Sequence, residues 1–228
     1  MASPLFVTFE GLDGSGKTSH LSAAAQRLRA RGAELTCTHE PGGTELGNAL
    51  RALFKDRRWP DLDGRVELLL LFASRRQLLL EVIDPALAAG RHVLCDRFTD
   101  STMAYQGGGR AVELETILTV DLVATGCRRP DRTLLLDVAP EQARARRQAS
   151  SRKPGAPPPD RLDDLDLSFY ARVRECYLEL ARSEPERFVV IDASGEREAT
   201  AAQVDLALRD LEPVGSPLRH AREAGGPS

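Results

Sequence analysis

The sequence predicts an α/β fold in which a five-stranded parallel sheet is covered by helices on both faces. Short apolar stretches that suit buried strands alternate along the chain with segments of helical periodicity. The 228 residues and the 42 % hydrophobic content are enough for one domain with a sizeable core. A glycine-rich segment directly follows the first apolar stretch, where a parallel sheet binds ligands beyond the carboxyl ends of its strands.

The expected strands are short apolar runs bounded by polar or turn residues: 5–9, 34–38, 91–95, 132–138 and 187–194. The expected helices carry apolar residues at helical spacing: 18–31, 45–54, 65–89, 113–124, 141–147, 165–181 and 199–211. Glycine at 32 and at 90 ends two of these helices. Residues 65–89 are apolar almost all round, so we expect a central helix that is covered on several sides.

Two segments do not follow this alternation of strands and helices. The stretch after Arg147, QASSRKPGAPPPD, contains prolines and a glycine that cannot continue a helix, so we expect an exposed, mobile lid over about 144–163. The end of the chain is rich in proline and glycine. We therefore expect a single domain over 1–212 and a disordered tail over 213–228.

Composition excludes several classes of protein. The chain has 31 basic and 34 acidic residues and a net charge of -3, which predicts binding to neither nucleic acid nor membranes. Its longest apolar run, 66–73, is far shorter than a membrane span. The cysteines at 37, 95, 127 and 176 are widely spaced, form no CxxC pair and follow no secretory signal, so we expect buried, reduced thiols in a cytoplasmic protein.

The segment after the first strand matches the phosphate-loop pattern G-x-x-x-x-G-K-[ST] and lies between a strand and a helix. This context predicts a P-loop NTPase fold. Backbone N–H groups of such a loop surround phosphates at a helix N-terminus, Lys17 can reach the β/γ oxygens, and the Thr18 hydroxyl can bind Mg²⁺. The expected ATP-binding residues are Gly11, Leu12, Asp13, Gly14, Ser15, Gly16, Lys17 and Thr18.

A phosphate loop does not distinguish a kinase from a GTPase or a motor ATPase, so the acceptor site needs separate evidence. Asp96 and Arg97 follow the third expected strand, at the ligand-binding edge of the sheet. Asp96 could orient metal-bound water or the acceptor, and Arg97 could bind a phosphate with two parallel hydrogen bonds. A surface ion pair is the alternative interpretation.

Several motifs together resemble the bacterial thymidylate kinases. FEGLDGSGKT, EPGGT, LFASRR, DRF with STMAYQGGGR, PDRTLLLDV and DRLD occur in the family's order over about residues 5–211. AYQGGGR and EPGGT are more specific than the phosphate loop. The resemblance implies a monophosphate-kinase fold, a homodimer, Mg²⁺, and transfer of the ATP γ-phosphoryl group to dTMP to give dTDP in dTTP biosynthesis.

The resemblance also implies roles for individual residues. Lys17, Asp96 and Arg97 would be catalytic, and Thr18, Asp96 and Asp163 would contact the metal. The substrate-binding residues would be Asp13, Arg51, Phe72, Arg75, Arg76, Arg97, Thr102, Tyr105 and Gln106. Arg51 and Arg97 would hold the dTMP phosphate, Phe72 would stack on thymine, and Tyr105 would exclude a ribose 2′-hydroxyl. On composition alone, Phe72 suits the core better.

Three positions depart from the family pattern. His39 stands where the family has an arginine before EPGGT, and Asp163 replaces the glutamate that ends the lid motif. The arginine that contacts the base is Arg75 when counted back from DPAL, but Arg76 when counted four residues on from Phe72. The sequence therefore leaves open whether Arg75 or Arg76 contacts the base.

Phosphoryl transfer needs cations that neutralise charge on the transferred group. The variable positions of the phosphate loop are not basic, whereas the segment after Pro140 is rich in basic residues: Arg144, Arg146, Arg147, Arg152, Lys153 and Arg161. We expect Arg147 or Arg152 to be the catalytic lid arginine, with a solvated charged surface as the alternative.

Three other functions share parts of this sequence pattern. A kinase for another nucleotide or nucleoside would share the phosphate loop and the lid but not AYQGGGR. A GTP-dependent switch would need an NKxD-type segment, whereas the stretch after the fifth strand reads DASGE. A motor or partitioning ATPase would need long partner-binding surfaces, and the sequence shows none.

Overall fold

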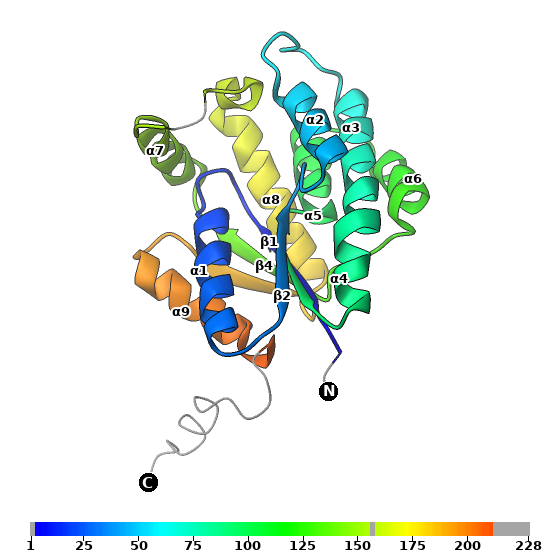
Figure 1. Ribbon diagram of the computed structural model, residues 1–228. Coiled ribbons are helices and arrows are strands. Elements are labelled where there is room, and N and C mark those ends of the chain that lie inside the picture. The colour runs from blue at the N-terminus through cyan, green and yellow to red at the C-terminus, as the bar shows by residue number, and fades with distance from the viewer. Residues whose placement is uncertain (1–2, 156–157, 212–228) are drawn as a thin grey trace.

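The computed structural model describes residues 3–155 and 158–211 and has a helical layer on each side of a central sheet (Figure 1). The expected tail over 213–228 lies outside the described residues. The five strands are β1 (Phe6–Glu10), β2 (Leu35–His39), β3 (His92–Asp96), β4 (Arg132–Asp137) and β5 (Phe188–Asp192). They form a fully parallel sheet in the order β2-β3-β1-β4-β5. This confirms the predicted α/β fold.

The longer helices are α1 (Lys17–Ala30), α2 (Glu45–Lys55), α3 (Gly64–Leu78), α6 (Leu114–Thr125), α7 (Pro140–Ser151), α8 (Leu167–Ser183) and α9 (Arg197–Ala207). Shorter helical segments are η1 (Leu79–Ile83), α4 (Asp84–Ala88), α5 (Thr99–Thr102), η2 (Met103–Gly109), η3 (Arg161–Asp164) and η4 (Arg209–Leu211). Helices α1 and α9 pack on one face of the sheet, and α4 and α8 pack on the other.

The central strand β1 shows how the sheet separates these two layers. All five of its residues are buried, and their side chains alternate between the faces. Val7 and Phe9 join the core cluster that includes the apolar side of α1. Phe6 packs against Phe98 in an edge-to-face contact at 4.9 Å, and Glu10 points to the same face as Phe6, toward α5 and α8.

The helix expected over 65–89 is present with one irregular turn. Helices α3 and α4 are joined without a break by the π-helical turn η1. The helix is covered on several sides, by α2, α6 and η2, although Val66, Leu69 and Leu80 are exposed. The sequence analysis missed α5 and η2, whose stretch STMAYQGGG carries small and polar residues without a clear apolar period.

Helix α7 extends four residues beyond the expected end at Arg147, because the first proline that could stop it is Pro154. The lid is therefore partly helical.

The cysteine prediction was also partly wrong. All four thiols are free, but Cys37 on the edge strand β2 and Cys127 after α6 are exposed. Across the described part of the chain, no helix combines the length and apolar character that membrane crossing requires.

Candidate active site

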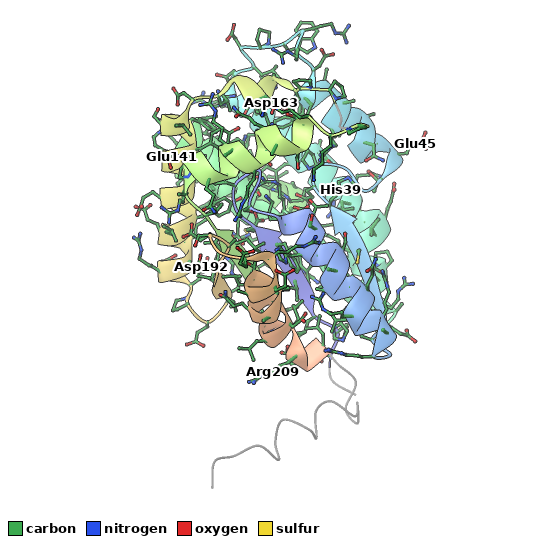
Figure 2. The ribbon with its side chains drawn as sticks, turned by 90° about the vertical axis from the view of Figure 1, so that its left-hand side faces the viewer. His39, Glu45, Glu141, Asp163, Asp192 and Arg209 are labelled. Atoms are coloured by element: carbon green, nitrogen blue, oxygen red, sulfur yellow. The ribbon has the colours of Figure 1, made fainter. Side chains whose placement is uncertain are left out.

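A cleft of about 1400 Å³ opens beyond the carboxyl ends of β1, β2 and β3. The phosphate loop forms its floor, and residues of α2, α3, η2, α7 and the lid end form its walls. In Figure 2, His39 marks the β2 end of this region and Asp163 marks the lid end. A parallel sheet brings these loops together because the chain leaves every strand at the same edge.

The phosphate loop depends on glycine at two close contacts. Gly11 has a φ of 133° and Gly14 has a φ of 94°, both outside the region that other residues prefer. A Cβ on Gly14 would lie 2.1 Å from the Ala143 carbonyl oxygen on α7, and one on Gly11 would lie 2.4 Å from the Leu136 carbonyl oxygen. The loop thus packs directly between β4 and α7. Leu12 is buried in the core, and Ser15 is also buried.

Lys17 is buried and closes the loop on itself. Its Nζ donates hydrogen bonds to the carbonyl oxygens of Gly11 at 3.1 Å and Leu12 at 2.8 Å. Burial, and next the Arg97 cation, lower the pKa of Lys17 to about 8, while Asp13, Asp96 and Glu10 oppose this shift. A bound polyphosphate would bring negative charge to this ammonium group and stabilise its charged form.

Thr18 and Asp96 place oxygen atoms together at the start of α1. The Thr18 hydroxyl donates a hydrogen bond to the Asp96 Oδ2, and both residues line the cleft. A hydroxyl next to a carboxylate is the kind of donor set that binds Mg²⁺ together with nucleotide phosphates. Within residues 3–155 and 158–211, no group of three or more His, Cys, Asp or Glu residues is arranged to hold a metal ion.

The third expected metal contact, Asp163, is engaged by protein groups. Its Oδ1 lies 2.5 Å from the Arg147 Nη2, and its Oδ2 accepts the Asp160 N–H at 2.6 Å within the capping box of η3. A metal contact through Asp163 would therefore share this carboxylate with Arg147 and the Asp160 N–H.

Arg97 lies between the phosphate loop and η2. Its Nη2 donates to Asp13 at 2.7 Å and to the Tyr105 hydroxyl at 3.1 Å, and its guanidinium carbon lies 4.8 Å from the centre of the Tyr105 ring. Burial alone would raise the pKa of Asp13, but Arg97, Lys17 and Arg147 together hold it well below its usual range. Asp13 therefore carries a negative charge among these cations throughout the physiological pH range.

The structure places Arg75 and Arg76 in different surroundings. Arg75 is buried and lines the cleft, where it donates to Glu40 at 2.7 Å, to Thr102 at 3.0 Å and to the Phe98 carbonyl oxygen at 3.2 Å. Arg76 is exposed and does not line the cleft. The Nη1 of Arg75 has no hydrogen-bond partner, which leaves a buried donor for a ligand. Of the two candidates, only Arg75 can reach a base in this cleft.

Phe72 is also placed differently from the expectation. It is 1 % exposed, packs with Leu68, Met103 and Ile117, and does not line the cleft. The Arg75 guanidinium covers its ring at 4.5 Å. The apolar side chain of α3 that lines the cleft is Leu71, one turn before Arg75. A base in the cleft would therefore meet Leu71, with the Phe72 ring lying behind Arg75.

A polar cluster centred on Glu67 closes this end of the cleft. The buried Glu67 carboxylate accepts hydrogen bonds from Gln106 at 2.8 Å, from Arg110 at 2.9 Å and from Arg161 of η3 at 2.7 Å. The Gln106 Oε1 is buried without a partner. The cluster connects the lid end to α3 and η2 and leaves an acceptor atom for a ligand.

The basic residues differ in their relation to the cleft. Arg51 lines it and donates to the Pro41 carbonyl oxygen at 2.8 Å. Arg147 also lines it, donates to the Tyr170 hydroxyl at 3.0 Å and approaches Asp13 to 3.9 Å. Arg152, the residue at the end of α7, is exposed and does not line the cleft. Of the two expected lid arginines, the structure brings only Arg147 to the phosphate loop.

The sequence analysis did not assign roles to Glu10, Glu40 and Glu67, although all three are buried around this cleft. A signal was present for two of them. Glu67 interrupts the longest apolar run, and Glu10 ends a strand that is otherwise apolar apart from Thr8. A charged residue in a buried segment requires a partner, and such partners gather at functional sites.

A phosphate loop that faces a pocket of unpartnered polar atoms across one cleft, on a parallel sheet, defines a P-loop kinase. A family model described as thymidylate kinase matches residues 9–204. The chain is 46 % identical to the thymidylate kinase of Desulfovibrio desulfuricans, over 90 % of this chain and 94 % of that protein. It is 47 % identical to that of Cupriavidus metallidurans, over 83 % and 90 %.

The crystal structure of thymidylate kinase from Ehrlichia chaffeensis superposes with a TM-score of 0.73 at 31 % identity, over 91 % of this chain and 99 % of that one. The chain belongs to the thymidylate kinase family.

Proposed function

We propose that this enzyme transfers the γ-phosphoryl group of ATP to dTMP, giving dTDP, with Mg²⁺ bound to the nucleotide. The observation that carries the proposal is the position of Arg97, between the phosphate loop and the pocket formed by Arg75, Gln106 and Tyr105. The names of the relatives support dTMP as the acceptor.

Each side of the cleft then has a defined task. The amides of the phosphate loop and Lys17 bind the ATP phosphates, and Arg97 with Arg51 binds the acceptor phosphate. Arg147 neutralises charge on the transferred group as the lid closes and excludes water. Thr18 and Asp96 would hold Mg²⁺, which neutralises phosphate charge when bound. Alignment and charge neutralisation are the main requirements of phosphoryl transfer.

Base recognition uses the unpartnered polar atoms. The Arg75 Nη1 is a donor that suits a thymine carbonyl oxygen, and the Gln106 Oε1 is an acceptor that suits the thymine N3–H. Leu71 provides the apolar wall against the base. Tyr105 lies beside Asp13 and Arg97, where it would crowd a ribose 2′-hydroxyl.

The test is coupled ATP turnover with dTMP, dUMP, dCMP, UMP, CMP and thymidine as acceptors. We expect dTMP to be phosphorylated far faster than UMP or CMP, and thymidine not to replace it. Equal turnover of UMP or CMP would contradict the proposal and favour a kinase for other nucleotides.

We also propose a homodimer in which a second copy covers the exposed apolar side chains of α2, α3, η1 and α6. These residues are Leu46, Leu53, Val66, Leu69, Leu80, Leu114, Leu118, Leu122 and Val123, and we call them the apolar face. Helices α2, α3 and α6 lie side by side in Figure 1. Exposed apolar side chains on neighbouring helices are typical of a protein interface. The four free thiols support a cytoplasmic location.

A further inference from the structure

Arg97 has an unusual backbone conformation that its neighbours must stabilise. Its φ is 75°, in the left-handed region, which costs a non-glycine residue of order 1 kcal/mol. Its N–H donates to the Phe9 carbonyl oxygen at 3.0 Å. The next N–H, that of Phe98, donates to the Glu10 Oε1 at 2.7 Å. Glu10 thus fixes the turn that points the Arg97 side chain into the cleft.

Glu10 also reaches the Arg97 guanidinium through two hydroxyls. Its Oε2 accepts hydrogen bonds from Ser101 at 2.5 Å and from Tyr177 at 2.8 Å. The Arg97 Nη1 donates to the same two oxygens, at 2.9 Å for Ser101 and 3.2 Å for Tyr177. A guanidinium has only donors, so each hydroxyl must accept from Arg97. The two hydroxyl oxygens also lie 2.8 Å apart, so one hydroxyl donates to Glu10 and the other donates either to Glu10 or to its neighbour. We call these two hydroxyls the Ser101–Tyr177 relay.

The direction of the relay depends on the charge of Glu10. An ionised carboxylate accepts both hydroxyl protons on Oε2. A protonated Glu10 has one O–H of its own, so it can leave the hydroxyls without a full set of acceptors. A hydroxyl whose proton turns away from Glu10 toward Arg97 can no longer accept from the Arg97 Nη1. The guanidinium would then lose one of its four side-chain hydrogen bonds and part of the constraint that holds it.

We propose that Glu10 is a positioning residue that orients Arg97 toward the acceptor phosphate, directly through the Phe98 N–H and indirectly through the Ser101–Tyr177 relay. The inference rests on the proposed function, in which Arg97 binds that phosphate. Glu10 itself is fully buried and does not line the cleft, so it acts on the substrate only through Arg97.

The charged and titratable groups that face Glu10 come from the elements packed around it: Lys17 of α1, Glu40 after β2, Cys95 of β3, Arg97, Asp100 of α5 and Tyr177 of α8. Burial, and next the Asp100 carboxylate, raise the pKa of Glu10 to about 7, whereas Arg97 and the two hydroxyls oppose the shift. The orienting, ionised form of Glu10 is therefore populated above neutral pH and lost below it.

The first test is a double-mutant cycle on dTMP kinetics at pH 8 with Glu10→Gln, Arg97→Ala and the double variant. Glu10→Gln should lower kcat/KM for dTMP about tenfold and leave KM for ATP within about twofold. In the Arg97→Ala background the same change should have no further effect, because the residue through which it acts is gone. Multiplicative losses would show that Glu10 acts independently of Arg97 and would overturn the proposal.

The second test is the pH dependence of the ratio of kcat/KM for the wild type to that for Glu10→Gln. Ionisation of the dTMP phosphate affects both proteins and cancels in this ratio. We expect the ratio to fall from about ten at pH 8.5 to near one at pH 6, where Glu10 is neutral in the wild type as well. A ratio that stays constant across this range would overturn the proposal, since a purely structural loss has no such profile.

Asp121→Asn is the matched control, because Asp121 is equally buried and paired with Arg129 at 2.6 Å but does not line the cleft. It should leave dTMP kinetics unchanged. If Glu10→Gln does not fold, Tyr177→Phe removes one relay hydroxyl instead. The same double-mutant cycle is then measured with Tyr177→Phe and Arg97→Ala. The wild-type acceptor assay tests the proposed function separately, so either idea can fail while the other stands.

Discussion

At the scale of the residue, the arginine side chains decide what this cleft can bind. Four of them have distinct surroundings: Arg75 is held by Glu40, Arg97 by Asp13 and the relay, Arg147 by Asp163, and Arg161 by Glu67. Each guanidinium is oriented by a carboxylate before any substrate arrives. Pre-oriented cations lose less conformational entropy when a phosphate binds, and this is how the site gains affinity for an anion.

Arg97→Ala should raise KM for dTMP and lower kcat, for a loss of about 100-fold in kcat/KM, because charge-assisted hydrogen bonds to the phosphate disappear. Arg97→Lys should recover activity only in part, since an ammonium lacks the two-pronged geometry. ATP affinity by direct titration should stay unchanged in both. Arg91→Ala, at the exposed residue just before β3, is the control. Normal dTMP kinetics in Arg97→Ala would remove Arg97 from the acceptor site.

Arg147→Ala should lower kcat by about 100-fold with little change in KM for dTMP, because its contact with the transferred group forms mainly in the transition state. Arg152→Ala is the matched control and should have near-normal kcat, since this arginine does not line the cleft. Steady-state kinetics of the two variants compare them directly. The reverse pattern would assign the catalytic role to Arg152.

The raised pKa of Glu10 should also make the free energy of unfolding depend on pH. Its native pKa of about 7, against 4.5 for the free side chain, means that the native state holds a proton which the unfolded chain has released. Glu10 therefore makes the protein less stable as pH rises from about 4.5 to 7, by up to about 3 kcal/mol. Urea unfolding should show a smaller decline with pH in Glu10→Gln than in the wild type. Identical declines would contradict the raised pKa.

At the scale of the element, α7 connects the phosphate loop to the lid. Its residue Ala143 contacts Gly14, and four residues later Arg147 reaches Asp163 and Tyr170. One helical turn therefore separates the loop contact from the lid contact. This places the lid arginine at a fixed height above the phosphate loop, which a flexible loop over the same residues would not do.

Gly14→Ala should disrupt this contact, because its new Cβ meets the Ala143 carbonyl oxygen and its φ becomes strained. We expect ATP affinity to fall at least about tenfold, measured by direct titration. Gly126→Ala is the control, since Gly126 also has a positive φ, 64°, but a Cβ there has open space. It should cost about 1 kcal/mol of stability and leave ATP affinity intact. Equal ATP losses in both variants would contradict a specific role for the loop contact.

At the scale of the whole molecule, the cleft and the apolar face occupy different parts of the surface. The cleft lies beyond the strand ends, whereas the apolar face lies on α2, α3, η1 and α6. Helix α3 belongs to both, because Leu71 and Arg75 line the cleft and Leu69 is exposed on the outer side. A partner copy on this face would therefore support the helix that holds Leu71 and Arg75, the residues that we propose contact the base.

Leu122→Glu should convert the protein to a monomer, because a buried, unpaired carboxylate in a dimer interface is costly. Leu206→Glu is the matched control: Leu206 on α9 is 55 % exposed and Leu122 is 60 % exposed, but α9 lies away from the apolar face. Light scattering during gel filtration gives the mass of each. A wild-type mass of one chain at all concentrations would refute the dimer.

Local patterns in the sequence were enough to predict the sheet and the phosphate loop. Apolar runs of strand length, helical spacing and the residues of Gly11 to Thr18 are properties of neighbouring positions, so they require no knowledge of distant contacts. The same holds for Asp96 and Arg97, because a polar pair after a buried strand of a parallel sheet must lie at its ligand-binding edge.

Only the tertiary structure decided which residues of a helix face the cleft. One position along a helix turns a side chain by about 100°, so a helix that is apolar on several sides gives no local sign of its orientation. Packing of α3 against α2 and α6 directs Leu71 and Arg75 to the cleft and leaves Phe72 in the core and Arg76 outside. Glu10 and Tyr177 meet for the same reason: 167 residues separate them in the chain, and only the packing of α8 on the sheet brings them together.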